Sequence, residues 1–82
     1  MDMPVQTSTK LSLAPDQAIA LFREEARHHG LPAENDGNTL TVRSPYGDIE
    51  VRNIDEGVLV TVSAPDRAKL YVLQETIDHM LA

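Results

Sequence analysis

The N-terminal part of the chain alternates between two kinds of side chain at every second position. From Val5 to Leu13, the odd positions hold Val, Thr, Thr, Leu and Leu, and the even positions hold Gln, Ser, Lys and Ser. Successive side chains of a strand point to opposite sides of a sheet, so a period of two is typical of a strand with one buried face. The pattern therefore predicts a strand over residues 5–13.

The next segment changes to the period of a helix. Pro15 and Asp16 suit a first helical turn, where proline has no hydrogen bond to lose and a carboxylate faces the positive end of the helix dipole. Gly30 is expected to end the helix in the left-handed conformation, and Pro32 prevents it from resuming. The predicted buried stripe of this helix is Ala18, Ile19, Phe22 and Ala26.

The middle of the chain predicts several antiparallel strands. A short edge strand is expected at residues 31–35, followed by a turn at Asp36 and Gly37. A second turn has Pro45 and Tyr46 at its centre.

The second turn fixes the pairing of the strands that flank it. It places Val42 opposite Ile49 on the inward face, with Arg43 opposite Asp48 on the outward face. The outward pair has opposite charges, which favours the same register as the apolar pair.

A third turn, at Asp55 and Glu56, predicts one more strand in this meander. Val51 then lies opposite Val60, and the three strands share one aliphatic face. That face is expected to consist of Leu40, Val42, Ile49, Val51, Val58, Val60 and Val62. The other face is polar and is expected to be exposed to water.

The C-terminal segment again has a helical period. Ser63 is expected to begin this helix, with Asp66 three residues later in an approximate capping box. The expected buried stripe is Leu70, Leu73, Ile77 and Leu81.

These elements predict a single α+β domain over residues 1–82 with the order β-α-β-β-β-β-α. Both helices are expected on one face of an antiparallel sheet. The order resembles the repeat unit of the TATA-binding-protein-like fold, but a fold shape does not by itself determine a function.

Composition and charge narrow the possible partners. The chain has thirteen acidic and seven basic residues, and its formal net charge is −6. Binding to phosphates needs a basic face, so neither nucleic acid nor a membrane is an expected partner.

The N-terminus does not resemble a signal peptide, and no apolar stretch approaches the roughly 20 residues of a membrane span. We expect a cytoplasmic protein of bacterial type, a monomer or weak homodimer without a cofactor.

The letters APD begin both helical segments, at Ala14 and Ala64, and a histidine follows thirteen residues after each Asp. A duplicated site would place both histidines in equivalent surroundings. At about 100° per residue, His29 continues the stripe of Phe22 and should be half-buried, whereas His79 should be exposed. We interpret the shared letters as a common way to begin a helix.

Three histidines are the candidate ligands for a metal or haem: His28, His29 and His79. The first two are adjacent, so they lie about 100° apart on a helix, which is poor geometry for one ion. Glu75 and His79 are one helical turn apart, but the sequence offers no further ligands beside them.

No catalytic residue is expected. The acidic pairs at residues 24–25 and 55–56 are predicted to be solvated, whereas a general acid or base needs a setting that shifts its pKa. The chain also has no Gly-x-Ser-x-Gly elbow and no glycine-rich phosphate loop.

Several motifs resemble those of a family of small bacterial domains of unknown function. The matching residues are Pro45-Tyr46-Gly47, Ala64-Pro65-Asp66, Leu73-Gln74 and a histidine near the end of the first helix, His28. Members of that family occur beside, or fused to, siderophore-interacting flavin reductases. The resemblance implies a role in iron or siderophore handling, with a siderophore-interacting flavoprotein or a small ligand as partner, and it implies no catalytic residue.

Three hypotheses follow. The first is a non-enzymatic accessory or binding module, which docks onto a protein or holds a small ligand between helices and sheet; the sequence does not indicate the ligand-binding residues. The second is a metal- or haem-binding protein, or a small enzyme, that uses the histidines. The third is self-association through the strand edge that begins at Val5.

Overall fold

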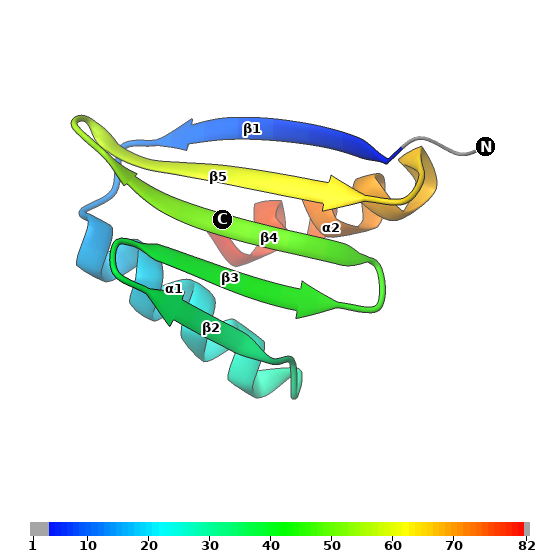
Figure 1. Cartoon of the computed structure of the whole chain (residues 1–82), viewed down its shortest axis with the longest axis horizontal. Coiled ribbons are helices and arrows are strands. Elements are labelled where there is room, and N and C mark those ends of the chain that lie inside the picture. Colours follow the sequence, from blue (N-terminus) through cyan, green and yellow to red (C-terminus); the bar gives the residue numbers. More distant parts are fainter. Residues whose placement is uncertain (1–3, 82) are drawn as a thin grey trace.

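The structure is a computed structural model that describes residues 4–81. It has one five-stranded antiparallel sheet and two helices in the predicted order β-α-β-β-β-β-α (Figure 1), which confirms the α+β class. The elements are β1 (Val5–Leu11), α1 (Pro15–His28), β2 (Ala33–Asp36), β3 (Thr39–Ser44), β4 (Gly47–Ile54), β5 (Gly57–Ala64) and α2 (Arg67–Leu81). Within residues 4–81, neither helix combines the length and the apolar character that crossing a bilayer requires.

The strand order is β1-β5-β4-β3-β2. Strands β2 to β5 follow one another as a meander, and β1 adds to its far side by pairing with β5. The predicted pairs are all present: Val42–Ile49, Arg43–Asp48 and Val51–Val60.

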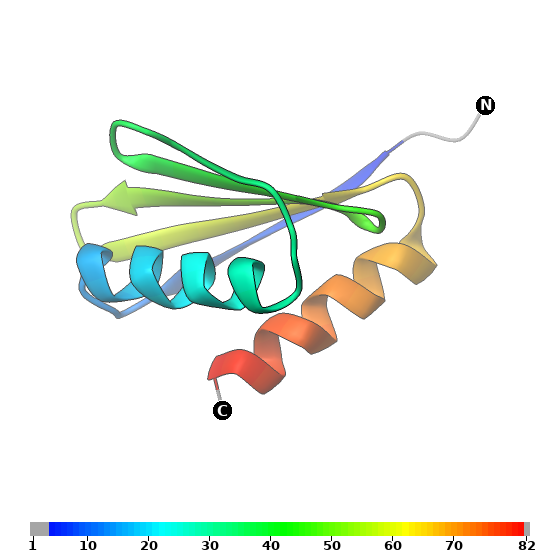
Figure 2. The same cartoon turned by 90° about the horizontal axis from the view of Figure 1, so that it is seen from below.

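Both helices cover the same face of the sheet, as predicted (Figure 2). The core lies between this face and the helices. All seven strand residues of the predicted aliphatic face are buried, together with Ala18, Phe22, Ala26, Leu73 and Ile77 from the helices. Ile19 and Leu70 are only partly buried against them, and the Leu81 side chain lies outside the described part of the structure.

The first strand is shorter than predicted and ends at Leu11. Leu11 pairs with Val58, and β5 begins one residue before that, at Gly57. Beyond Leu11 there is therefore little neighbouring strand to pair with, and the chain turns toward α1.

The predicted edge strand forms at residues 33–36 instead of 31–35, and its turn consists of Gly37 and Asn38. The shift arises at the end of α1. The amide of Leu31 donates to the carbonyl of Ala26 at 2.8 Å, and the amide of Gly30 donates to the carbonyl of Arg27 at 3.1 Å. Gly30 has a φ of 68°. These bonds form a Schellman cap, which holds Leu31 at the helix end.

The start of α2 differs from the prediction. Ser63 lies inside β5, where it pairs with Gln6 and Asp48. The N-cap is Asp66, whose Oδ1 accepts a hydrogen bond from the amide of Lys69 at 2.9 Å. Strand pairing extends through Ala64 and so delays the helix.

The two APD segments consequently occupy different structural positions. Helix α1 begins at Pro15, so Asp16 is its second residue, whereas Asp66 precedes α2. Ala64 is a buried strand residue and Ala14 is exposed.

Candidate functional site

A groove of about 430 Å³ opens between α1, α2 and the β3–β4 turn. Its floor consists of side chains that belong to the core: Phe22, Ala26, Val42, Ile49, Leu73 and Ile77. A ligand in this groove would contact mainly aliphatic surface.

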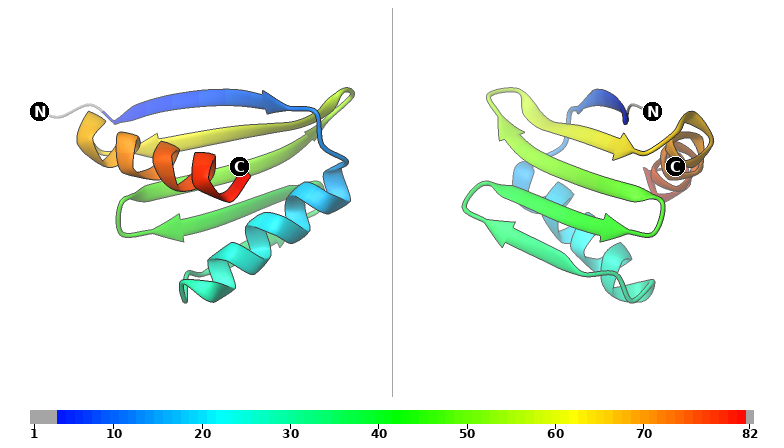
Figure 3. Two further views of the ribbon diagram at one scale, coloured as in Figure 1. Left: turned by 180° about the vertical axis from the view of Figure 1, so that it is seen from behind. Right: turned by 45° about the vertical axis from the view of Figure 1, so that its right-hand side comes forward.

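The groove exists because the two helices lie over different parts of the sheet. Helix α1 packs mainly on β3 and β4, while α2 packs mainly on β5 (Figure 3, left). Ala26 of α1 and Thr76 of α2 line the space between them. Both side chains are short, so they do not fill it.

Apolar side chains also stand at the rim. Four large hydrophobic residues are exposed in the described part of the chain: Leu21, Tyr46, Tyr71 and Val72. Of these, Tyr46 of the β3–β4 turn (47% exposed) and Val72 of α2 (41%) line the groove. An exposed apolar rim above an apolar floor is typical of a ligand site.

The position of Tyr46 is set by a hydrogen-bonded turn. The Ser44 hydroxyl donates to the carbonyl of Gly47 at 2.8 Å and accepts from the amides of Tyr46 and Gly47 at 3.1 and 3.2 Å. These three bonds fix the short turn and hold the tyrosine at the rim.

Gly47 allows the same turn to lie against the core. Its φ is 148°, which favours glycine, and a Cβ there would collide with the carbonyl oxygen of Ser63. The added carbon would also lie 3.1 Å from Cδ1 of Leu73. The Pro-aromatic-Gly motif thus combines a close approach to β5 and α2 with an aromatic ring at the groove.

One end of the groove is polar. Nε2 of His29 lies 2.9 Å from Oε1 of Glu25, and both residues line the groove. The side chains are 51% and 37% exposed, respectively. His29 is thus about half-exposed, close to the half-buried position that the sequence predicts. It is the C-cap residue, with φ −93° and ψ 3°, and so no longer follows the helical stripe.

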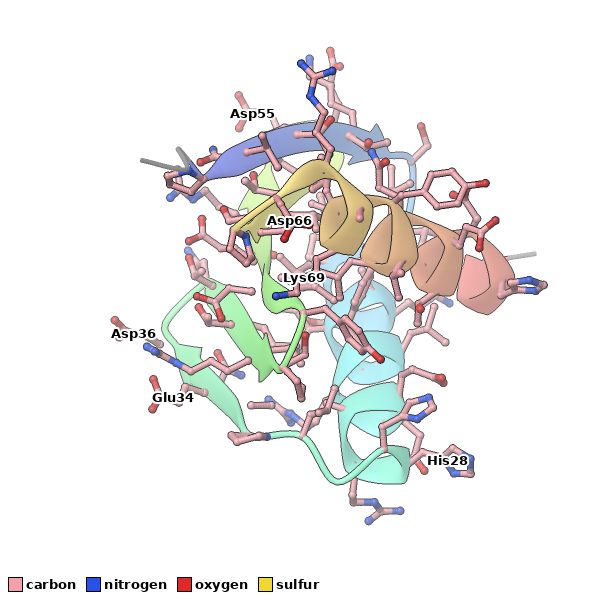
Figure 4. All side chains as sticks on the ribbon, turned by 90° about the vertical axis from the view of Figure 1, so that its right-hand side faces the viewer. His28, Glu34, Asp36, Asp55, Asp66 and Lys69 are labelled. Carbon is pink, nitrogen blue, oxygen red and sulfur yellow. The ribbon has the colours of Figure 1, made fainter. Side chains whose placement is uncertain are left out.

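The structure does not gather the three candidate histidines into one cluster. His28 points into solvent at the end of α1 (Figure 4), with its ring edge-on to His29 at a centroid distance of 5.4 Å. His79 is exposed on α2. Among the residues that the structure describes, no three His, Asp or Glu side chains are placed to hold a metal ion together.

Glu75 lies one helical turn before His79 on α2, and its side chain interacts with a tyrosine, Tyr71. Its carboxylate accepts a hydrogen bond from the phenol of Tyr71 and adds a repulsive charge, and both effects raise the pKa of Tyr71 above its ordinary value of 10.0. Tyr71 and Glu75 border a second, smaller hollow between α2 and β1, of about 330 Å³.

Glu24, Asp55 and Glu56 are exposed, as predicted, whereas Glu25 is only partly exposed beside the groove. Glu24 forms a surface ion pair with Arg27 at 3.2 Å, and Asp55 and Glu56 lie at the tip of the β4–β5 hairpin (Figure 4). Exposed acids of this kind have no desolvated setting that would suit them to general acid–base chemistry.

The outer face of the sheet is polar, as predicted, and carries both signs of charge. Asp48, Glu50 and Arg52 lie in a shallow hollow of about 480 Å³ on this face. Glu50 and Arg52 form an ion pair at 3.0 Å. Exposed ion pairs of this kind contribute little to the free energy of folding.

Comparison of the chain with protein-family models, with curated proteins and with solved structures gives no match. Fold and site together therefore define the class: a small α+β protein with a one-sided sheet and an apolar groove between its helices.

Sequence reasoning did not identify the residues of the groove. The available signals were Val72, an apolar residue outside the predicted stripe of its helix, and Tyr46, an aromatic residue in a turn. Neither indicates a groove until the helix positions are known.

Proposed function

We propose that this protein is a non-enzymatic binding module that holds a small, largely apolar molecule in the groove between α1 and α2. The observation that carries this proposal is the pair of exposed side chains, Tyr46 and Val72, above a buried apolar floor. The volume of about 430 Å³ falls within the range of roughly 300–1,000 Å³ that is usual for small-molecule sites.

The polar end of the groove indicates what else the ligand carries. The Glu25 carboxylate accepts hydrogen bonds, and each nitrogen of the His29 ring can donate or accept according to the tautomer. Both groups are partly exposed, so they can exchange water for a ligand at modest cost. A molecule with an apolar body and a hydroxyl or amine at one end fits this arrangement.

We further propose that the module serves bacterial iron–siderophore handling in the cytoplasm, next to a siderophore-interacting flavoprotein. The resemblance to domains found beside siderophore-interacting flavin reductases supports this context. The turn Pro45-Tyr46-Gly47 contributes to that resemblance, and its first two residues line the groove.

Titration of the labelled protein, followed by NMR, tests the proposal. Nile red serves as a neutral apolar probe, and a ferric siderophore serves as the probe of the iron context. Shifts are expected at Tyr46, Val72 and Ile77, with no comparable change on the outer face of the sheet. If Nile red shifts none of these three residues, the binding proposal is wrong.

A charged substitution at the rim adds a matched comparison. Val72→Glu should weaken Nile red binding about tenfold, since a carboxylate at the rim must lose water when the probe binds. Leu21→Glu introduces the same charge at an exposed apolar residue of α1 outside the groove, and it should leave the affinity unchanged. Equal losses in both variants would contradict a site between the helices.

A further inference from the structure

The two edges of the sheet differ in how well they are protected. Strand β2 has four residues, follows Pro32, and carries the charges of Glu34 and Asp36 (Figure 4). A short strand, a proline and charged side chains are the usual means by which proteins prevent edge-to-edge pairing.

Strand β1 lacks these features. It has seven residues, all in unbroken register with β5, and its only charged residue is Lys10. In the described structure no further strand lies beyond it (Figure 1). Its outward backbone groups are therefore available to another strand.

We infer that β1 pairs with β1 of a second copy of this chain. The pairing is antiparallel about a two-fold axis at Ser8, and it joins two five-stranded sheets into one continuous sheet. A closed two-fold interface of this kind uses the same surface on both copies. The inference concerns the β1 edge of the sheet, which contributes no residue to the groove, and it does not depend on the proposed ligand.

The sequence of β1 is complementary to itself in this register. Every residue of the strand then has a compatible partner: Val5 with Leu11, Gln6 with Lys10, Thr7 with Thr9, and Ser8 with Ser8. The Val5–Leu11 and Thr7–Thr9 pairs lie on the inner face. On the outer face, Ser8 lies opposite Ser8, and the neutral Gln6 lies opposite Lys10. No like charges are opposed, which is the arrangement that stabilises cross-strand pairs.

The hollow between β1 and α2 adds a second reason to expect a neighbour there. It is lined by Thr7, Thr9 and Leu11 from β1 and by Tyr71 from α2. The tyrosine is 61% exposed. A second copy would extend the sheet past β1 and so place a further strand beside this hollow.

Charge determines how the association responds to salt. Each chain has a formal net charge of −6, and Glu75 and Asp78 line the hollow that faces the second copy. Repulsion between the copies is screened by salt, so association should strengthen as ionic strength rises.

Sedimentation equilibrium of the full chain tests the inference, with variants that are specific to the register. Gln6→Glu places a carboxylate opposite Lys10 of the second copy and should tighten association about fivefold, whereas Gln6→Lys opposes two lysines and should weaken it similarly. Within one copy the two variants have the opposite electrostatic effects. Gln6 lies on the same face as Asp48, two strands away, so a lysine at position 6 is attracted to Asp48 and a glutamate is repelled by it. Opposite shifts of the two variants therefore identify contact between copies.

Ser8→Lys provides a second test, because it opposes two like charges at the two-fold axis and should weaken association about tenfold. Its control is Asn35→Lys, the same charge change at an exposed position of the other edge strand, which should have no effect. A wild-type chain that stays monomeric up to about 1 mM would overturn the inference and leave β1 for a strand of another protein. It would also be overturned if the two Gln6 variants shifted the mass in the same direction, or if Asn35→Lys dissociated the pair.

Discussion

The hydroxyl of Ser44 lies 2.8 Å from the carbonyl oxygen of Gly47 and closes the β3–β4 turn from within. Ser44→Ala removes this bond and leaves the amides of Tyr46 and Gly47 without their acceptor. We expect a loss of about 1–2 kcal/mol in the free energy of unfolding, measured by urea denaturation. Ser44→Thr keeps the hydroxyl and should lose less, and equal losses would show that the hydroxyl does not hold the turn.

Gly47 should tolerate substitution less well than a glycine in open surroundings. Gly47→Ala combines an unfavourable φ with a collision against the Ser63 carbonyl, so we expect a loss of about 3 kcal/mol or more. At Gly37, φ is 62° but nothing lies within 4 Å of an added Cβ, and Gly37→Ala should lose about 1 kcal/mol. Thermal unfolding of the two variants compares them directly. Similar losses would show that packing against β5 is unimportant.

The two aspartates that follow the shared letters Ala-Pro should contribute unequally to stability. Asp66→Ala removes the side chain that caps α2, at an expected cost of about 1 kcal/mol. Asp16 makes no capping bond in α1 and acts only through the helix dipole, so Asp16→Ala should cost about 0.5 kcal/mol or less. Urea denaturation of both variants measures the difference. A larger loss at Asp16 would contradict the assigned caps.

Tyr71 should titrate above its ordinary pKa of 10.0 because of Glu75. A raised pKa in the folded state means that the hydrogen-bonded neutral phenol stabilises the fold fully below the unfolded pKa, and that this contribution is lost as pH rises through the folded pKa. Glu75→Gln removes the charge and should lower the pKa of Tyr71 toward 10.0, as measured by NMR of the labelled ring. An unchanged pKa would show that Glu75 is not the cause.

The strand registers could be predicted because two independent patterns agreed. The Pro45-Tyr46 turn set the alignment, and alternation of apolar and polar residues then placed Val42 and Ile49 on one face. A slip of one residue would reverse the faces of the strand, so only one register satisfied both patterns.

Element boundaries were less predictable because they depend on contacts between distant segments. Ser63 looks like a helix start in the sequence, but its pairing with Gln6 and Asp48 keeps it in the sheet. Leu31 looks like a strand residue, but its amide is held by Ala26 at the helix end. The groove was unpredictable for the same reason, since it arises from the relative placement of two helices.

The pairing of β1 with β5 has a consequence for how the chain assembles. Each turn of the meander closes over two residues, whereas Val5 pairs with Ala64 across nearly the whole chain. Contacts between sequence-distant segments carry a larger loop-closure cost and form more slowly. During synthesis, β1 emerges long before its partner and must wait, unpaired, until residues 58–64 have been made. The strand that completes the sheet is thus the first to be translated and the last to be docked.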